Sequence, residues 1–167
     1  MKADKPSKMK SCIAVVGGSS PSADELTLAE EVGRLVAEAG VVLVCGGLGG
    51  VMEAACRGAK SVGGLTVGIL PGSDCKAANP YVDVVIPTGL GYARNSVVAY
   101  SGQAVIAVGG SAGTLSEMCF ATFGDIPVFS LGSWTLSERP VSPGRPPTVV
   151  NSPAEAVKAA LVAIGKS

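Results

Sequence analysis

The feature that most constrains this chain is a repeated unit: a short apolar run, a glycine-rich turn and then a helical stretch. In the first copy, residues 12–16 are apolar, Gly17-Gly18 follow, and residues 24–39 carry apolar side chains at helical spacing. Ser22 and Glu25 match a capping box at the start of this expected helix. Runs that are apolar on both faces and stop at glycine are typical of buried parallel strands. Strands that alternate with helices at this spacing predict βαβ units joined by right-handed crossovers.

The unit recurs along the chain and predicts an α/β fold, a single-domain Rossmann-like three-layer sandwich with a mostly parallel sheet. Further strands are expected at residues 41–45, 65–70, 82–86, 104–108, 127–131 and 148–150. Further helices are expected at residues 51–61, 92–101, 114–123 and 152–164. We expect a flexible N-terminus over residues 1–10, one domain over 11–167, and within it a proline-rich surface loop over 132–147.

Composition excludes several classes of protein. Hydrophobic residues make up 47% of the chain and charged residues 16%, which excludes a mostly disordered chain. The 13 basic residues balance the 13 acidic ones, so no nucleic-acid partner is expected. The chain has no histidine, which removes histidine-dependent nucleophilic catalysis and histidine-ligated metal; we expect no metal site. The polar start is unlike a secretory signal and no apolar run reaches the ~18 residues of a membrane span, so we expect a cytoplasmic protein without membrane contact.

The glycine-rich turns mark the expected binding site, because ligands of parallel sheets bind beyond the carboxyl ends of the strands. Glycine there lets backbone N–H groups approach a ligand closely, and each following helix offers a positive N-terminus to an anion. One such turn is no more than a tight connection, but together they favour a basin for a phosphate-bearing small molecule. The candidate residues in these turns are Gly17, Gly18, Ser19, Gly46, Gly47, Gly49, Gly50, Pro71, Gly72, Gly91, Gly109 and Gly110. The first turn does not match G-x-G-x-x-G, and the chain has no G-x-x-x-x-G-K-[ST] loop, so neither NAD nor P-loop chemistry is expected.

The segment from residue 109 to 117 contains the strongest candidates for ligand binding and catalysis. Ser111, Gly113 and Thr114 can contact a phosphate through backbone N–H and hydroxyl groups. Glu117 is expected in the first helical turn, where a carboxylate can stabilise a cationic transition state or position water. Thr114 and Glu117 also match a capping box, worth about 1 kcal/mol of helix stability. Capping does not exclude chemistry, but capping alone would leave Glu117 without a chemical role.

Arg94 stands directly after the glycine-rich turn at residues 88–91, and two interpretations of it remain open. A guanidinium at this place can grip a phosphate through two parallel hydrogen bonds. The alternative is an arginine of the solvated surface with no ligand. The residue type and its position do not decide between the two.

Taken together, these segments resemble the LOG-type proteins, a family once mislabelled as lysine decarboxylases that includes a branch of molybdenum-cofactor carrier proteins. The resemblance spans about residues 12–131, and its last motif is quite specific when it follows a strand. It rests on Gly46-Gly47-x-Gly49-Gly50-Val51-Met52-Glu53-Ala54, Gly68-Ile69-Leu70-Pro71-Gly72, Gly91-x-x-Arg94-Asn95 and Gly109-Gly110-x-x-Gly113-Thr114-x-x-Glu117. It implies a nucleotide-type ligand whose phosphate lies at the glycine-rich loops, with Met52 and Asn95 among the ligand-binding positions.

The enzymes of this family cleave the N-glycosidic bond of nucleoside 5′-monophosphates and release the base and ribose 5-phosphate. Their catalytic pair corresponds to Arg94 and Glu117. The chain departs from the enzymes in being somewhat shorter and at two positions: Asn95 stands where they usually have lysine, and Val108 where they usually have proline. These departures look more like the carrier branch, whose members hold molybdenum cofactor, a pterin with a phosphate, without transforming it.

Three functions remain open at this point. The first is a binding or carrier protein for a phosphorylated heterocycle, with molybdenum cofactor as a candidate cargo and no cofactor required. The second is a nucleoside 5′-monophosphate phosphoribohydrolase, and the third is a structural or regulatory oligomer that binds phosphate incidentally. The helices expected at residues 92–101 and 114–123 carry one charge each, Arg94 and Glu117. Helices without a charged face are often covered by another subunit, so we expect a homodimer or homotetramer formed through them.

Overall fold

The computed structural model describes residues 9–136 and 144–166. The strands are β1 Cys12–Gly17, β2 Val42–Cys45, β3 Thr66–Leu70, β4 Val84–Pro87, β5 Ala104–Val108, β6 Val128–Leu131 and β7 Thr148–Val150. The helices are α1 Ala23–Glu38, α2 Val51–Ser61, α3 Arg94–Ser101, α4 Ala112–Phe123 and α5 Pro153–Ala163, and the 3₁₀ turns are η1 Cys75–Ala77 and η2 Gly91–Ala93. Every strand and helix expected from the sequence is therefore present.

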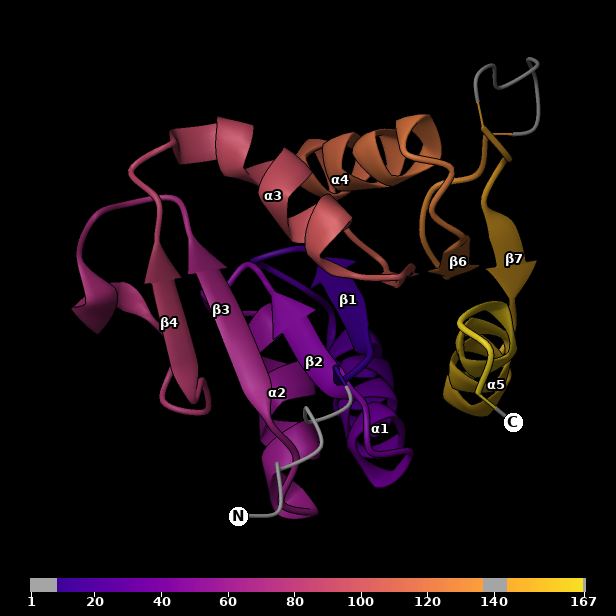
Figure 1. Cartoon of the computed structure of the whole chain (residues 1–167), viewed down its shortest axis with the longest axis horizontal. Coiled ribbons are helices and arrows are strands. Elements are labelled where there is room, and N and C mark those ends of the chain that lie inside the picture. Colours follow the sequence, from indigo (N-terminus) through magenta and orange to yellow (C-terminus); the bar gives the residue numbers. More distant parts are fainter. Residues whose placement is uncertain (1–8, 137–143, 167) are drawn as a thin grey trace, which may run out of the picture.

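The seven strands form one sheet in the order β4-β3-β2-β1-β5-β6-β7, and all neighbouring strands run parallel. Helices α1, α2 and α5 pack together on one face, while α3 and α4 lie side by side on the other (Figure 1). The three-layer arrangement confirms the predicted single-domain Rossmann-like α/β fold. The sheet is parallel throughout, where the sequence predicted a mostly parallel one.

The central strand β1 shows why its sequence is apolar without alternation. Ile13 and Val15 pack into the layer of α1, α2 and α5, while Ala14 and Val16 pack into the layer of α3 and α4. All four side chains are buried, as is usual for a strand covered on both faces. Because β2 and β5 lie on opposite sides of β1, the connections after β1 and β5 diverge and leave a crevice at the carboxyl edge of the sheet.

Three element boundaries differ from the prediction by two residues. Strand β4 begins at Val84 rather than residue 82, because the carboxylate of Asp83 accepts the backbone N–H of Thr66 at 2.9 Å and ladder pairing starts one residue later. Residues 92 and 93 belong to η2, so α3 begins only at residue 94. Helix α4 begins two residues earlier than predicted, and this shift changes the environment of its first polar side chains.

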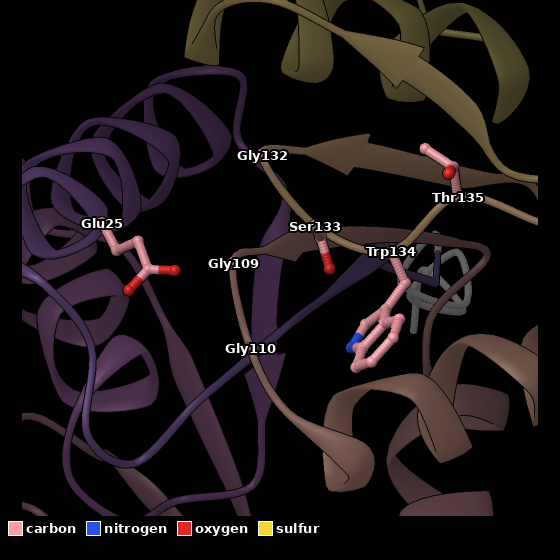
Figure 2. A pocket seen from close by; sticks show the side chains of 7 residues that line it. All are labelled: Glu25, Gly109, Gly110, Gly132, Ser133, Trp134 and Thr135. Carbon is pink, nitrogen blue, oxygen red and sulfur yellow. The ribbon is translucent and has the colours of Figure 1, made fainter.

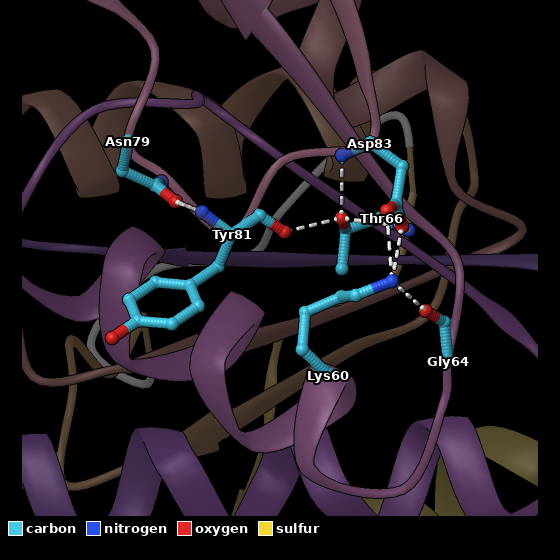
Figure 3. A network of polar contacts seen from close by, with 6 residues as sticks. All are labelled: Lys60, Gly64, Thr66, Asn79, Tyr81 and Asp83. Carbon is cyan, nitrogen blue, oxygen red and sulfur yellow. Dashed lines mark hydrogen bonds and ion pairs between the residues drawn. The ribbon is translucent and has the colours of Figure 1, made fainter.

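A polar cluster fixes the connection between β3 and β4 (Figure 3). Nζ of Lys60, in α2, lies 2.7 Å from Oδ1 of Asp83, and Thr66 donates to the same carboxylate. Partial burial opposes the ionisation of Asp83, but the hydrogen bonds from Lys60 and Thr66 outweigh it and lower the pKa of Asp83. The side-chain amide of Asn79 donates to the carbonyl of Leu48 at 2.9 Å, which ties this connection to the turn after β2.

Two further expectations concern the N-terminus and the proline-rich loop. Residues 1–8 of the N-terminus and residues 137–143 of the loop lie outside the described residues. The described parts of the loop, residues 132–136 and 144–147, form neither helix nor strand. In the part of the chain that the structure describes, no helix is long and apolar enough to cross a membrane.

Candidate functional site

A pocket of about 630 Å³ opens at the carboxyl edge of the sheet, where the connections after β1 and β5 diverge. Its wall is formed by the β1–α1 turn, the start of α2, the η2–α3 junction and the first turns of α4. This volume lies within the range of about 300–1,000 Å³ that is usual for small-molecule sites. Among the residues predicted from the sequence, the pocket is lined by Gly17, Gly18, Ser19, Met52, Arg94, Asn95, Ser111, Gly113, Thr114 and Glu117.

Arg94 and Glu117 form an ion pair in this pocket. Nη1 of Arg94 lies 3.3 Å from Oε1 of Glu117, and the two residues are 7% and 6% exposed. The pairing depends on the packing of α3 against α4, because Arg94 is the first residue of α3 and Glu117 lies in the second turn of α4. The interpretation of Arg94 as a solvated surface residue is therefore wrong. Its Nε has no hydrogen-bond partner among the described residues.

Burial sets the protonation of this pair. Removal from water raises the pKa of Glu117 from 4.5 to about 7, and the charge of Arg94 offsets part of that rise. Removal from water also lowers the pKa of Arg94, against the attraction of Glu117. A carboxyl group whose pKa is near 7 can give or take a proton at neutral pH, which is what general acid–base chemistry requires. The pair is therefore suited to chemistry as well as to binding.

The first turn of α4, which lines the pocket, contains polar groups without partners among the described residues. The N-cap residue Ser111 makes no side-chain capping hydrogen bond, whereas Ser22 caps α1 and Ser152 caps α5. Thr114 is 2% exposed, and its Oγ1 has no hydrogen-bond partner within the described residues. The capping box predicted from Thr114 and Glu117 is wrong, because α4 begins before both of them. Uncapped N–H groups beside a buried free hydroxyl form a local arrangement that suits a bound anion.

Asn95 holds α3 against the first turns of α4. Its Nδ2 donates to Oγ of Ser116 at 2.8 Å, and Oγ of Ser116 donates to the carbonyl of Gly113 at 2.7 Å. This chain of hydrogen bonds fixes the backbone around Gly113, so Asn95 positions the first turn of α4. Arg94 and Glu117 are the only charged residues among those that line the pocket.

Gly46 leaves space for the guanidinium of Arg94. A Cβ atom at position 46 would collide with Nη1 of Arg94, so a larger residue there would displace the arginine. Directly before it, Cys45 accepts the backbone N–H of Gly47 at 3.3 Å and lies 3.5 Å from Cys56, measured between the Sγ atoms. Both thiols are buried and free. Gly46 therefore leaves the space that the guanidinium of Arg94 occupies, next to the turn formed by Cys45 and Gly47.

The other predicted residues lie outside the lining of this pocket: Gly46, Gly47, Gly49, Gly50, Pro71, Gly72, Gly91, Gly109 and Gly110. Gly50 has a left-handed backbone with φ 71° and packs against the backbone of Gly18, so it shapes the wall from behind. Pro71 and Gly91 form part of the turn beyond β3, where the carbonyl of Pro71 accepts the N–H of Gly91 at 2.9 Å. Gly109 and Gly110 line a separate, smaller pocket.

Four lining residues were not predicted: Leu48, Tyr92, Ala112 and Ser116. Each lies within two residues of a predicted position in the sequence, and that proximity is the signal that could have identified them.

Over residues 9–136 and 144–166, no group of three or more cysteine, aspartate or glutamate side chains is placed to hold a metal ion.

Comparisons with known proteins agree with the Rossmann-like α/β fold. Residues 10–157 match the sequence profile of the SLOG cluster4 family. The molybdenum cofactor binding protein of Rippkaea orientalis superposes with a TM-score of 0.84 at 35% identity, over 95% of this chain and 99% of that one. The molybdenum cofactor carrier protein of Chlamydomonas reinhardtii superposes with a TM-score of 0.82 at 32% identity, over 95% of this chain and 100% of that one. A cytokinin riboside 5′-monophosphate phosphoribohydrolase of Mycobacterium tuberculosis is 36% identical over 111 residues, which are 64% of this chain and 59% of that enzyme.

Proposed function

The chain belongs to the SLOG cluster4 family, and from that membership and the site geometry we propose that it binds a phosphate-bearing heterocyclic small molecule in the pocket between β1, α3 and α4. The proposed role is that of a carrier protein, with molybdenum cofactor as the first cargo to test. The observation that carries the proposal is the hydroxyl of Thr114, which is buried at the uncapped start of α4 without a partner in the part of the chain that the structure describes.

Leaving the hydroxyl of Thr114 without a hydrogen bond lowers the stability of the folded protein. A buried hydroxyl without a hydrogen bond costs about 1–3 kcal/mol, which a folded protein rarely leaves uncompensated. A phosphate at this place would accept hydrogen bonds from Oγ1 of Thr114 and from the first N–H groups of α4, and would gain from the positive end of the helix. The same pocket is lined by Arg94, whose Nε has no hydrogen-bond partner among the described residues.

The carrier role is placed ahead of catalysis for two reasons. The likeness to solved proteins that bind or carry molybdenum cofactor extends over nearly the whole length of both chains, whereas the likeness to the phosphoribohydrolase covers 59% of that enzyme. In addition, Asn95 is occupied by hydrogen bonds to α4, so the second cation of the enzymes' motif has no counterpart at that position.

Two isosteric threonine variants test the binding proposal. Thr114→Val removes the hydroxyl offered to phosphate, and Thr122→Val removes a buried hydroxyl of the same helix that already donates to the carbonyl of Met118 at 2.9 Å. Calorimetric titration with molybdenum cofactor and with AMP should show binding to the wild type that falls roughly tenfold or more in Thr114→Val. Thr122→Val should lose stability and keep its affinity. Equal affinity of Thr114→Val and wild type, or no binding of either ligand to the wild type, would refute the proposal.

A second candidate function, nucleoside 5′-monophosphate hydrolysis, is favoured by the buried Arg94–Glu117 pair. In that reaction water adds at C1′ of the ribose, the bond from C1′ to the base nitrogen breaks, and the base leaves with a proton. Glu117, with a pKa of about 7, could supply that proton or, when ionised, stabilise positive charge on the sugar. The assay is the release of adenine from AMP; turnover that disappears in Glu117→Gln would replace the carrier proposal by this one.

We propose that a second copy of this chain packs against the outer face of α3 and α4. Tyr92, Tyr100 and Phe123 are 90%, 54% and 62% exposed there, and Phe123 also borders an apolar groove of about 350 Å³ along α4. Exposed apolar patches of this kind mark protein interfaces. Light scattering should show a dimer or larger oligomer for the wild type and a monomer for the double variant Tyr100→Glu, Phe123→Glu. A monomeric wild type at micromolar concentration would contradict this assembly.

A further inference from the structure

A second pocket, of about 290 Å³, lies beside the first at the carboxyl edge of the sheet (Figure 2). Its walls come from the first turn of α1, the turn after β5 and the segment after β6. Its lining includes the carboxylate of Glu25, the hydroxyl of Ser133 and the indole of Trp134. The backbone from Gly109 to Gly113 separates the two pockets, because its first residues line the second pocket and its last residues line the first.

The indole of Trp134 is held in one orientation. Its Nε1 donates to the carbonyl of Ser111 at 3.1 Å, and Oγ of Ser130 donates to the carbonyl of Trp134 at 2.8 Å. The residue nevertheless remains 42% exposed, so the ring is fixed but not covered. A fixed and open aromatic ring is a surface on which a flat ligand ring can stack at little entropic cost.

The carboxylate of Glu25 has one oxygen committed and one available. Oε2 accepts the backbone N–H of Ser22 at 2.7 Å, which completes the capping box of α1. Oε1 lies against the backbone of Gly109, where a side chain would collide with it, and accepts no hydrogen bond from the described residues. A carboxylate repels phosphate, so the glycine turn on this side is unsuited to an anion. The other oxygen of Glu25, Oε1, can accept a hydrogen bond from an N–H donor of a ligand.

We propose that this second pocket, built by Glu25, Ser133 and Trp134, binds the ring of an amino-bearing planar heterocycle whose phosphate lies at the first turn of α4. The ring stacks on Trp134 and donates an N–H to Oε1 of Glu25. A pocket of about 290 Å³ holds one ring system rather than a whole nucleotide, so the rest of the ligand extends over the backbone toward Thr114. This inference rests on the proposed function, because it takes the phosphate site as its other end.

The two-pocket arrangement separates the ring from the Arg94–Glu117 pair. Neither Arg94 nor Glu117 lines the second pocket, and neither Glu25 nor Trp134 lines the first. A ligand bound across both would keep its ring away from the ion pair that could act on a glycosidic bond. The geometry therefore favours holding such a ligand intact, as a carrier does.

The single tryptophan of the chain reports directly on this site. Three probes test the amino group, the ring and the phosphate separately. GMP carries an amino group on its ring, IMP has the same ring without that group, and ribose 5-phosphate has no base ring. GMP should quench the fluorescence of Trp134 saturably and bind roughly tenfold more tightly than IMP. Ribose 5-phosphate should bind by calorimetry without quenching, because it reaches only the phosphate site.

Glu25→Gln tests the carboxylate while it preserves the helix, because glutamine also serves in a capping box. Glu155→Gln is the matched control, since Glu155 occupies the same position in α5, where its carboxylate accepts the N–H of Asn151 at 2.8 Å. Glu25→Gln should abolish the preference for GMP over IMP and leave the affinity for ribose 5-phosphate unchanged, and Glu155→Gln should change neither.

The outcomes separate this inference from the proposed function. Ribose 5-phosphate binding that depends on Thr114, without quenching by GMP or without an effect of Glu25→Gln, would overturn the ring site and leave the phosphate site standing. Quenching by GMP that is lost in Glu25→Gln, with no affinity for ribose 5-phosphate, would support the ring site and count against the phosphate site. No binding of any probe would overturn both.

Discussion

Replacing Glu117 by glutamine should change how the stability of the protein depends on pH. In the folded protein, burial raises the pKa of this carboxyl from 4.5 to about 7. Between these two values the folded state binds a proton that the unfolded chain has already released, so raising the pH favours unfolding. One unit of pKa corresponds to about 1.4 kcal/mol, so the wild type should lose about 3 kcal/mol of stability through this group between about pH 4 and pH 8. Glutamine does not titrate, and the variant should not show this loss.

The assay is urea unfolding of wild type and Glu117→Gln at a series of pH values, with Thr122→Val as a control. Other titrating groups contribute equally to all three proteins, so the difference between wild type and variant isolates residue 117. The free energy of unfolding of Glu117→Gln, relative to wild type, should rise by about 3 kcal/mol from about pH 4 to pH 8. The difference between Thr122→Val and wild type should stay constant. Parallel curves for wild type and Glu117→Gln would refute the burial argument.

Three further predictions concern the site and its support. Affinity for AMP should fall as the pH rises through about 7, because ionised Glu117 repels phosphate, and calorimetry should show a smaller fall in Glu117→Gln. Gly46→Ala should weaken ligand binding roughly tenfold by displacing Arg94, while Gly72→Ala, where a Cβ meets nothing within 4 Å, should bind as wild type. Asp83→Asn should cost about 1 kcal/mol at neutral pH in urea unfolding. Because hydrogen bonds lower the pKa of Asp83, that advantage of the wild type should be lost as the pH falls through the folded pKa; a constant difference would contradict the assigned contacts.

The order of strands and helices could be predicted from sequence because it depends on local patterns of residues. Apolar runs closed by glycine located the strands, and Ser22 with Glu25 located the start of α1 correctly. The start of α4 was placed two residues too late because Thr114 and Glu117 also have the spacing of a capping box. Spacing alone does not reveal that the hydroxyl of Thr114 is buried without a hydrogen-bond partner among the described residues rather than bonded to the backbone.

The parts of the site that depend on distant residues were less accessible to sequence reasoning. Arg94 was left as either a phosphate ligand or a surface residue, and only the packing of α3 on α4 shows that it is buried against Glu117. Trp134 lies in a segment predicted as a surface loop, and Glu25 was recognised only as a helix cap. These two residues line one pocket because β5 and β6 are neighbours in the sheet, which no local pattern in the chain encodes.

The proposed phosphate site is best tested by a crystal structure of the protein with ribose 5-phosphate bound. We expect a phosphate oxygen within about 3 Å of Oγ1 of Thr114 and of a backbone N–H in the first turn of α4. A phosphate found elsewhere, with the hydroxyl of Thr114 turned to a partner inside the protein, would contradict it.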